Sequence, residues 1–276
     1  MRAIHISEFT SSITSLKPST IPLQYDAKTT VLIKVTHVSP THVDILYTKG
    51  KHQNNRTIAK PPFVLGTDFA GIVVSVPTGT DLQPGERVYG SYFGAFAEYV
   101  AVNPALGSIR RVPGNWSSGE ACAVGSSGAI SLGCFRRVGR SIEGEWVLVT
   151  GASGGLGVAA CQVARALGAR VIALIGDDEK AAVLKSTGVE ACVKYTKQGW
   201  EKRVLEISGG GVSVVYDGVG LVEQSLRCCK FGGTVVIVGF AGRGGDMENL
   251  KVNRILLKGA GVIGYVSQRP LQKTFH

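Results

Sequence analysis

A glycine-rich turn is the part of this sequence whose residue types most clearly indicate chemistry. It follows the apolar run Trp146–Thr150 and carries glycine at positions 151, 154, 155 and 157. Glycines at this spacing let the chain turn tightly, bring backbone N–H groups close to a pyrophosphate, and let the next helix pack on the strand. The helix N-terminus adds the positive end of its dipole. The sequence therefore predicts a dinucleotide-phosphate site made of Gly151, Ala152, Ser153, Gly154, Gly155, Leu156 and Gly157.

The next apolar run, Arg170–Ile175, indicates which dinucleotide fits. An NAD site usually ends this strand with an acid that bonds the ribose 2′-hydroxyl. Here the run is followed by Gly176, which leaves room for a 2′-phosphate, and Lys180 can pair with that phosphate. Tyr195, at the end of the following strand, is expected beside the adenosine ribose. We therefore predict NADPH as the cofactor, with Gly239 and Phe240 at the end of a later strand completing the cofactor-binding set.

Two acids leave a second interpretation of the cofactor open. Asp177 and Asp178 follow Gly176 directly, and either could serve as the ribose carboxylate of an NAD site. Acids are also favoured in the first turn of a helix, where they face the positive end of the dipole. We favour this helix-start role.

Composition restricts the class of protein. The chain has 276 residues, of which 44% are apolar and 18% charged, which fits about two folded domains and excludes global disorder. The formal net charge of +10 favours anionic partners, which include phosphorylated cofactors. No run of five basic residues occurs, and we predict no nucleic-acid partner; an RNA-binding role of the second half of the chain, supported by net charge alone, is the alternative.

The N-terminal segment and the cysteines indicate the compartment in which the protein is expected. The N-terminus lacks the apolar core of a signal peptide, and no window of about 18 uninterrupted apolar residues exists, so no membrane association is expected. The six cysteines form no C-x-x-C and no Cys/His cluster with metal-ligand spacing. This usage is typical of a reducing compartment, and we predict a cytoplasmic protein.

The elements that must position these residues differ between the two halves of the chain. Residues 1–115 contain short strands punctuated by turn residues, which indicates a small barrel or sandwich. The pattern becomes helical near Ser117 and then alternates strand and helix, which predicts a parallel, doubly wound sheet. The expected strands of the first half include Val31–Val38, Ala70–Val76, Arg87–Tyr89 and Ala97–Val102. Those of the second half are Trp146–Thr150, Arg170–Ile175, Glu190–Tyr195, Val212–Asp217, Thr234–Gly239 and Gly261–Tyr265. The helices expected between them include Glu179–Thr187, Trp200–Ile207 and Leu221–Lys230.

Six stretches of the sequence carry motifs that occur together in one enzyme family. They are LGTDFAG (65–71), PGERVYG (84–90), GAFAEYV (94–100), GEWVLV (144–149), the glycine turn itself and VVYDGVG (214–220). Together they resemble the medium-chain dehydrogenases/reductases, in their zinc-free quinone-oxidoreductase-like branch, and the resemblance runs from about residue 1 to residue 265. It implies an N-terminal GroES-like β-domain, residues 1–116, and a Rossmann domain with a doubly wound parallel sheet, residues 117–276.

The resemblance allows the zinc-ligand positions of the family to be compared with the residues of this sequence. Zinc-dependent relatives place a cysteine three residues before the acid that corresponds to Asp44, a histidine in a Gly-His-Glu triplet, and a second cysteine further on. Those positions are Thr41, Thr67 and Ser126 here, none of which is a usual zinc ligand. We therefore expect no metal site.

Without zinc, side chains must polarise the substrate carbonyl. The candidates for a proton donor or an oxyanion hydrogen bond are Thr41, Tyr47 and Tyr92, each with an ordinary structural role as the alternative. Asp44 and Asp68 are expected to organise the site rather than to exchange protons.

The resemblance implies an NADPH-dependent oxidoreductase that transfers a hydride to a quinone or an α,β-unsaturated carbonyl. The expected partner is that small molecule, and a homodimer is the expected assembly. An enoyl reductase of a biosynthetic pathway is one alternative. The family pattern continues beyond Tyr265, and the segment after about Val266 does not resemble it. An NADPH-binding protein with incomplete closing elements in its first domain, and with little or no turnover, is therefore the other alternative.

The zinc positions generate a first prediction. The purified protein should hold no stoichiometric zinc, and its activity should survive strong chelation, because two threonines and a serine occupy the three ligand positions. Elemental analysis is the measurement. One zinc per chain would contradict the prediction.

Overall fold

The computed structural model describes residues 1–57, 59–242 and 248–266, and the chain divides into two compact units, Met1–Ser126 and Ser127–His276. The division falls within one long helix, α2 (Ser118–Arg137), and so comes later than the expected 116/117 boundary. The reason is that the first turns of α2 bury Ala121 and Cys122 in the N-terminal unit. The segment after Val266 that the sequence sets apart from the family pattern lies outside the described residues.

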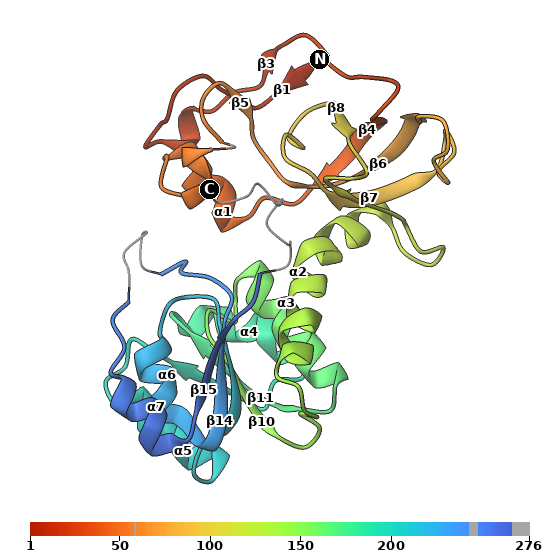
Figure 1. The fold of residues 1–276 in the computed structure, drawn as a ribbon. Coiled ribbons are helices and arrows are strands. Elements are labelled where there is room, and N and C mark those ends of the chain that lie inside the picture. The colour runs from red at the N-terminus through yellow and green to blue at the C-terminus, as the bar shows by residue number, and fades with distance from the viewer. Residues whose placement is uncertain (58, 243–247, 267–276) are drawn as a thin grey trace. The chain divides into compact units, whose positions relative to one another are not determined.

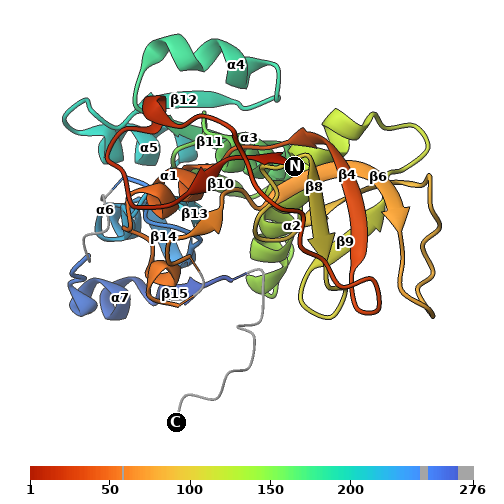
Figure 2. The same cartoon turned by 90° about the horizontal axis from the view of Figure 1, so that it is seen from above.

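Short apolar strands build a five-stranded antiparallel sheet in the N-terminal unit (Figure 2). Its order is β8-β4-β6-β7-β9. Gly71 in β6 lies so close to β4 that a Cβ there would overlap the Lys34 carbonyl oxygen, which explains a glycine in the middle of a strand. The strands are β4 (Val31–Val38), β6 (Asp68–Ser75), β7 (Arg87–Ser91), β8 (Tyr99–Val102) and β9 (Ser108–Arg111).

A second, smaller core of the N-terminal unit includes Tyr47 of helix α1 (His42–Thr48). Tyr47 projects from α1 into this core and packs with Ile6, Phe63 and Leu65. Two short strand pairs surround it, β1 (Arg2–Ala3) with β3 (Ser19–Thr20) and β2 (His5–Ile6) with β5 (Phe63–Val64). Two 3₁₀ turns, Ile13–Ser15 and Gln53–Arg56, complete the region.

The C-terminal unit is a six-stranded parallel sheet, as the alternating pattern predicts (Figure 1). The strand order is β12-β11-β10-β13-β14-β15. The chain adds β11 and β12 on one side of β10 and then β13, β14 and β15 on its other side, so the topological switch point lies between β10 and β13. In open α/β sheets, ligands bind outside the carboxyl ends of the strands at this switch point. The strands are β10 (Trp146–Val149), β11 (Arg170–Ile175), β12 (Ala191–Lys194), β13 (Val212–Asp217), β14 (Cys229–Ile237) and β15 (Gly261–Gly264).

Helices cover both faces of this sheet. Side chains of successive strand residues point to opposite faces, so Val147 and Val149 join one core while Leu148 joins the other. The first core is closed by α2, α3 (Gly155–Ala166) and α4 (Ala181–Lys185), and the second by α5 (Trp200–Ser208), α6 (Val222–Cys228) and α7 (Val252–Lys258). Among the described residues, no helix combines the length and apolarity needed to cross a membrane.

The largest error in the predicted element bounds concerns helix α6 and strand β14. The helix expected over Leu221–Lys230 ends at Cys228, and β14 begins at Cys229. Cys229 pairs with Val212, after which the register shifts, because residues 230–233 bulge out of the strand. Gly232 supplies the positive φ of +72° that this excursion requires.

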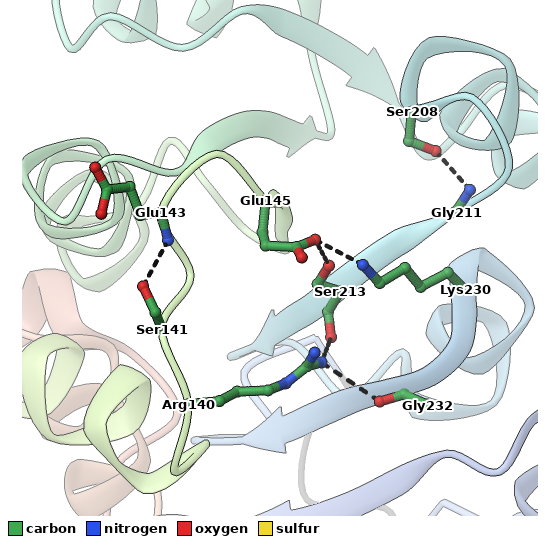
Figure 3. Close-up of polar contacts among 9 residues, drawn as sticks. All are labelled: Arg140, Ser141, Glu143, Glu145, Ser208, Gly211, Ser213, Lys230 and Gly232. Carbon is green, nitrogen blue, oxygen red and sulfur yellow. Dashed lines mark hydrogen bonds and ion pairs between the residues drawn. The ribbon is translucent and has the colours of Figure 1, made fainter.

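A group of polar contacts, here called the amino-end cluster, ties the strands together opposite the carboxyl ends (Figure 3). The Lys230 ammonium lies 2.7 Å from a Glu145 carboxylate oxygen, which also accepts a hydrogen bond from the Ser213 hydroxyl. The Arg140 guanidinium donates to the carbonyl oxygens of Ser213 and Gly232, at 3.1 and 3.3 Å. These contacts hold the loop before β10 against the beginnings of β13 and β14.

Candidate functional site

The glycine turn joins β10 to α3 at the switch point. Gly151 has φ +58°, and the Gly154 N–H donates to the Gly151 carbonyl at 3.0 Å. A Cβ on Gly157 would overlap that same carbonyl oxygen and lie 2.6 Å from Ala152 Cα. The closeness of helix and turn therefore depends on having no side chain at position 157.

The beginning of α3 fits a phosphate. Gly154 is the N-cap residue and offers no side-chain cap, and the first N–H groups of a helix have no partner within the helix. A Cβ on Gly155 would meet nothing within 4 Å, so the space beside this residue is open. Backbone N–H groups beside open space at a helix N-terminus are what a pyrophosphate requires.

The ends of β11 and β12 lie beside each other next to this turn. Gly176 faces the Tyr195 side chain, because a Cβ there would lie 3.0 Å from the Tyr195 hydroxyl oxygen. The Asp177 carboxylate accepts from the Glu179 N–H, and the Asp178 carboxylate lies 3.0 Å from the Lys194 ammonium. The structure thus gives Asp177 the helix-start role that we favour. Lys180 is exposed in the same turn.

A buried carboxylate organises the loop after β13. Asp217 is 0% exposed and accepts from the Thr150 hydroxyl at 2.6 Å. It also accepts from the backbone N–H groups of residues 219, 220 and 221, at 3.2, 3.3 and 2.9 Å. Burial raises the pKa of this carboxyl, and these hydrogen bonds oppose the rise. Thr150 Oγ1 in turn accepts from the Gly218 N–H at 3.1 Å.

The loop after β14 approaches that same segment. A Cβ on Gly239 would lie 3.2 Å from the Gly218 carbonyl oxygen. Phe240 follows and is 55% exposed. The sheet therefore brings the turn at 151–157 and the loops beginning at 176, 218 and 239 to one edge.

The N-terminal unit buries two carboxyls near α1. Thr41 caps α1, and its hydroxyl and N–H donate to Asp44 Oδ2 at 2.8 and 2.7 Å. Asp68 accepts from the Ser126 hydroxyl at 2.6 Å. Burial is the largest cause that raises the pKa of each carboxyl, and the hydrogen bonds only partly oppose it. For Asp68, the nearby Asp44 charge raises the pKa further.

The three proposed catalytic side chains do not form one cluster. Thr41 caps α1 and Tyr47 lies within it, but the Thr41 hydroxyl hydrogen is directed to Asp44. The Tyr47 ring is buried against Phe93, and its hydroxyl oxygen accepts from the Asn54 amide at 3.1 Å. Tyr92 instead packs against the core of the five-stranded sheet.

Sequence reasoning missed several polar residues around these positions. Thr150 and Asp217 each follow or end an apolar strand, and that change of residue type is the signal that could have found them. Asn54 and His52 flank Tyr47, and the His52 Nδ1 accepts from the Asn54 N–H at 3.1 Å. No local pattern in the sequence identifies His52 and Asn54, because the residue that they contact, Tyr47, belongs to a different element, helix α1.

The expected zinc-ligand positions serve other contacts. Thr41 caps a helix, the Thr67 carbonyl accepts from the Tyr92 N–H, and Ser126 donates to Asp68. Within residues 1–57, 59–242 and 248–266, no group of three His, Cys, Asp or Glu side chains is placed to hold a metal ion.

Comparison with known proteins matches both units. Residues 27–114 match the family profile described as "Alcohol dehydrogenase GroES-like domain", and residues 155–276 match the one described as "Zinc-binding dehydrogenase". The description of the second match names zinc, whereas the expected ligand positions 41, 67 and 126 lie outside the residues it covers.

Curated relatives include a bovine and a tomato protein. "Quinone oxidoreductase-like protein 2" of Bos taurus is 32% identical over 253 residues, which is 89% of this chain and 70% of that protein. "2-methylene-furan-3-one reductase" of Solanum lycopersicum is 33% identical over 220 residues, covering 75% of this chain and 54% of that protein. The solved structure of Escherichia coli quinone oxidoreductase complexed with NADPH matches with a TM-score of 0.85 at 25% identity, over 97% of this chain and 82% of that one.

Two glycines of the turn provide a matched pair for a stability prediction. Gly157→Ala should lower the free energy of unfolding by about 1–3 kcal/mol, because its Cβ overlaps backbone atoms that cannot move away independently. Gly155→Ala should be neutral or slightly stabilising, since its Cβ enters open space and alanine favours the helix. Urea unfolding of both variants is the measurement, and equal losses would contradict the packing argument.

The buried carboxyls predict a pH dependence. Because the folded-state pKa of Asp44 lies above its ordinary value of 3.8, the folded state binds more protons than the unfolded state above that pH. Its contribution to stability is therefore lost as the pH rises from about 4 through the folded-state pKa. Asp44→Asn should gain stability relative to wild type over that window, measured by urea midpoints at several pH values.

Glu98→Gln is a control for Asp44→Asn, because the pKa of Glu98 is shifted in the opposite direction. The Arg2 contacts lower the pKa of the exposed Glu98, so Glu98→Gln should lose stability relative to wild type as the pH rises from low values. Parallel midpoint curves for Asp44→Asn and wild type would show that Asp44 titrates normally.

Proposed function

The chain belongs to the medium-chain dehydrogenase/reductase family, in its zinc-free quinone-oxidoreductase-like branch, and from that membership we propose an NADPH-dependent reductase of quinones or α,β-unsaturated carbonyls. One observation carries the proposal. The turn at 151–157, with no side-chain cap on its helix, stands at the switch point of a six-stranded parallel sheet. This combination of open N–H groups and strand order fits a dinucleotide.

NADPH rather than NADH is supported by the neighbouring strand ends. Gly176 faces the Tyr195 side chain, and both adjacent acids have a partner within the chain, since Asp177 caps a turn and Asp178 forms an exposed pair with Lys194. Lys180 is an exposed cation in the same turn, available to a 2′-phosphate. The similar Escherichia coli enzyme was solved with NADPH. When bound, this cofactor supplies the hydride.

The substrate class rests on the relatives' names and on the proton that the reaction needs. A quinone oxidoreductase-like protein and a furanone reductase are both similar to this chain. Quinones and enones each take up one hydride and one proton for each NADPH oxidised, so the products are a hydroquinone or a saturated carbonyl. A protein group must therefore donate a hydrogen bond or a proton to the oxygen on which charge develops.

Tyr47 is the best supported donor among the three candidates. Its hydroxyl oxygen accepts from the Asn54 amide, so the hydroxyl hydrogen is left to donate. A phenol is already protonated at neutral pH at its ordinary pKa of 10.0, and burial raises the pKa of Tyr47 further. Thr41 is less suited, because its hydroxyl hydrogen already goes to Asp44. Tyr92 stays a candidate on its partial exposure alone.

Assembly and compartment complete the proposal. Val252, Leu256 and Leu257 on α7 are each at least 72% exposed, and β15 is the edge strand of the sheet, which together support a homodimer. All six cysteines are free thiols, which supports a reducing, cytoplasmic compartment. Light scattering tests the dimer, and a monomeric mass at micromolar concentration would contradict it.

NADPH oxidation by the purified full chain tests the function. The panel should hold quinones and enones of increasing size, each compared with an acceptor-free blank. We expect consumption of NADPH with at least one class and formation of the reduced acceptor in equal amount. Binding of NADPH without turnover of any acceptor would reject the reductase.

Lys180 allows the cofactor preference to be tested separately. Lys180→Ala should raise the NADPH dissociation constant about tenfold or more, because a charge-assisted hydrogen bond contributes roughly 1.5–3 kcal/mol, and should barely change that of NADH. Lys185→Ala removes another exposed cation from the adjoining helix and is the matched control. Equal weakening of both cofactors would show that Lys180 does not bind the phosphate.

A further inference from the structure

We propose that Asp217 is the positioning residue of the dinucleotide site and holds the loop after β13 at a fixed spacing from the glycine turn. This inference rests on the proposed function, since the spacing concerns the dinucleotide. Asp217 lies at the carboxyl end of β13, next to β10 at the switch point. It was not among the residues that the sequence singled out as cofactor-binding.

The hydrogen bonds of Asp217 fix one short segment completely. Its two oxygens accept from the backbone N–H groups of residues 219, 220 and 221, and the Thr150 hydroxyl that donates to it accepts from the N–H of residue 218. Four successive N–H groups are thereby held by one carboxylate and one hydroxyl. A carboxylate that is 0% exposed binds such donors strongly, because no water competes for them.

The segment held in this way sets the position of both flanking loops. The Val219 side chain lies between Gly151 and Gly242, since a Cβ at either glycine would lie 2.7 or 2.5 Å from a Val219 methyl carbon. The Val219 carbonyl also accepts from the Gly242 N–H at 3.0 Å. Moving the segment would therefore move the first glycine of the phosphate turn on one side and the loop after β14 on the other.

The same strands carry an internal comparison at their opposite ends. Ser213, near the beginning of β13, is as buried as Asp217 and bonds Glu145 within the amino-end cluster (Figure 3). Both residues tie β13 to the chain beside β10, but only Asp217 does so at the edge where a dinucleotide would bind. A purely structural role would make the two residues equivalent in their effect on cofactor affinity.

Asp217→Asn is the principal variant, with Ser213→Ala as its matched control. Asparagine keeps the size but replaces one acceptor oxygen with an N–H₂ group that faces N–H donors. We expect the NADPH dissociation constant of folded Asp217→Asn to rise about tenfold or more, while that of Ser213→Ala stays within about twofold of wild type. Adenosine 2′-phosphate, which lacks the pyrophosphate, should bind all three proteins alike. Titration calorimetry measures each constant, and thermal unfolding verifies that each protein is folded.

Thr150 keeps the proposal testable where Asp217→Asn does not fold. Thr150→Val removes the bridging hydroxyl and should weaken NADPH binding in the same direction, while Thr150→Ser restores the hydroxyl and the affinity. If wild type binds NADPH and the Asp217→Asn and Thr150→Val proteins bind it equally well, the positioning role is overturned and the proposed function stands. If wild type binds no nicotinamide dinucleotide, both fall together.

Discussion

The near-contact of two backbone segments at Gly151 and Gly157 is the constraint on which the C-terminal unit depends. Helix α3 can begin within contact of the turn only because no Cβ separates them. This closeness turns the first N–H groups of α3 toward open space, and it leaves Val219 as the side chain beside Gly151. The site is thus defined by the absence of side chains at a few positions, which the surrounding sheet holds in place.

The N-terminal unit buries ionisable side chains beside hydroxyl groups. Two carboxyls, Asp44 and Asp68, lie in its interior and receive hydroxyl donors from Thr41 and Ser126. These hydroxyls stand at two of the positions where zinc-dependent relatives are expected to have metal ligands. Each hydroxyl donates to one carboxylate oxygen, so each acid has a local partner at one of those two positions, although Asp44 Oδ1 is buried without a hydrogen-bond partner among the described residues.

Local pattern predicted the fold well where elements are apolar and bounded by turn residues. The bounds of β4, β11 and β13 coincide with the expected ones, because each is rich in β-branched residues and is bounded by a change of residue type. The polar strand β9 was not predicted, since its pairing with β7 comes from distant residues. The hydrogen bond between Thr150 and Asp217 likewise joins residues that are 67 positions apart. Such partners, like the burial of Tyr47, are fixed only when separate elements pack together.

The two ends of β13 are held by interactions that respond differently to salt. At its beginning, Glu145 and Lys230 are each more than one third exposed, so dissolved ions screen their attraction. At its end, Asp217 is sealed from solvent, and ions cannot reach the groups that it binds. Added salt therefore weakens one partly exposed contact at the amino edge, which contributes about 0–1 kcal/mol, and does not act on the contacts of Asp217 at the opposite edge. The arrangement of residues 218–221 is accordingly expected to be the same in dilute buffer and in concentrated salt.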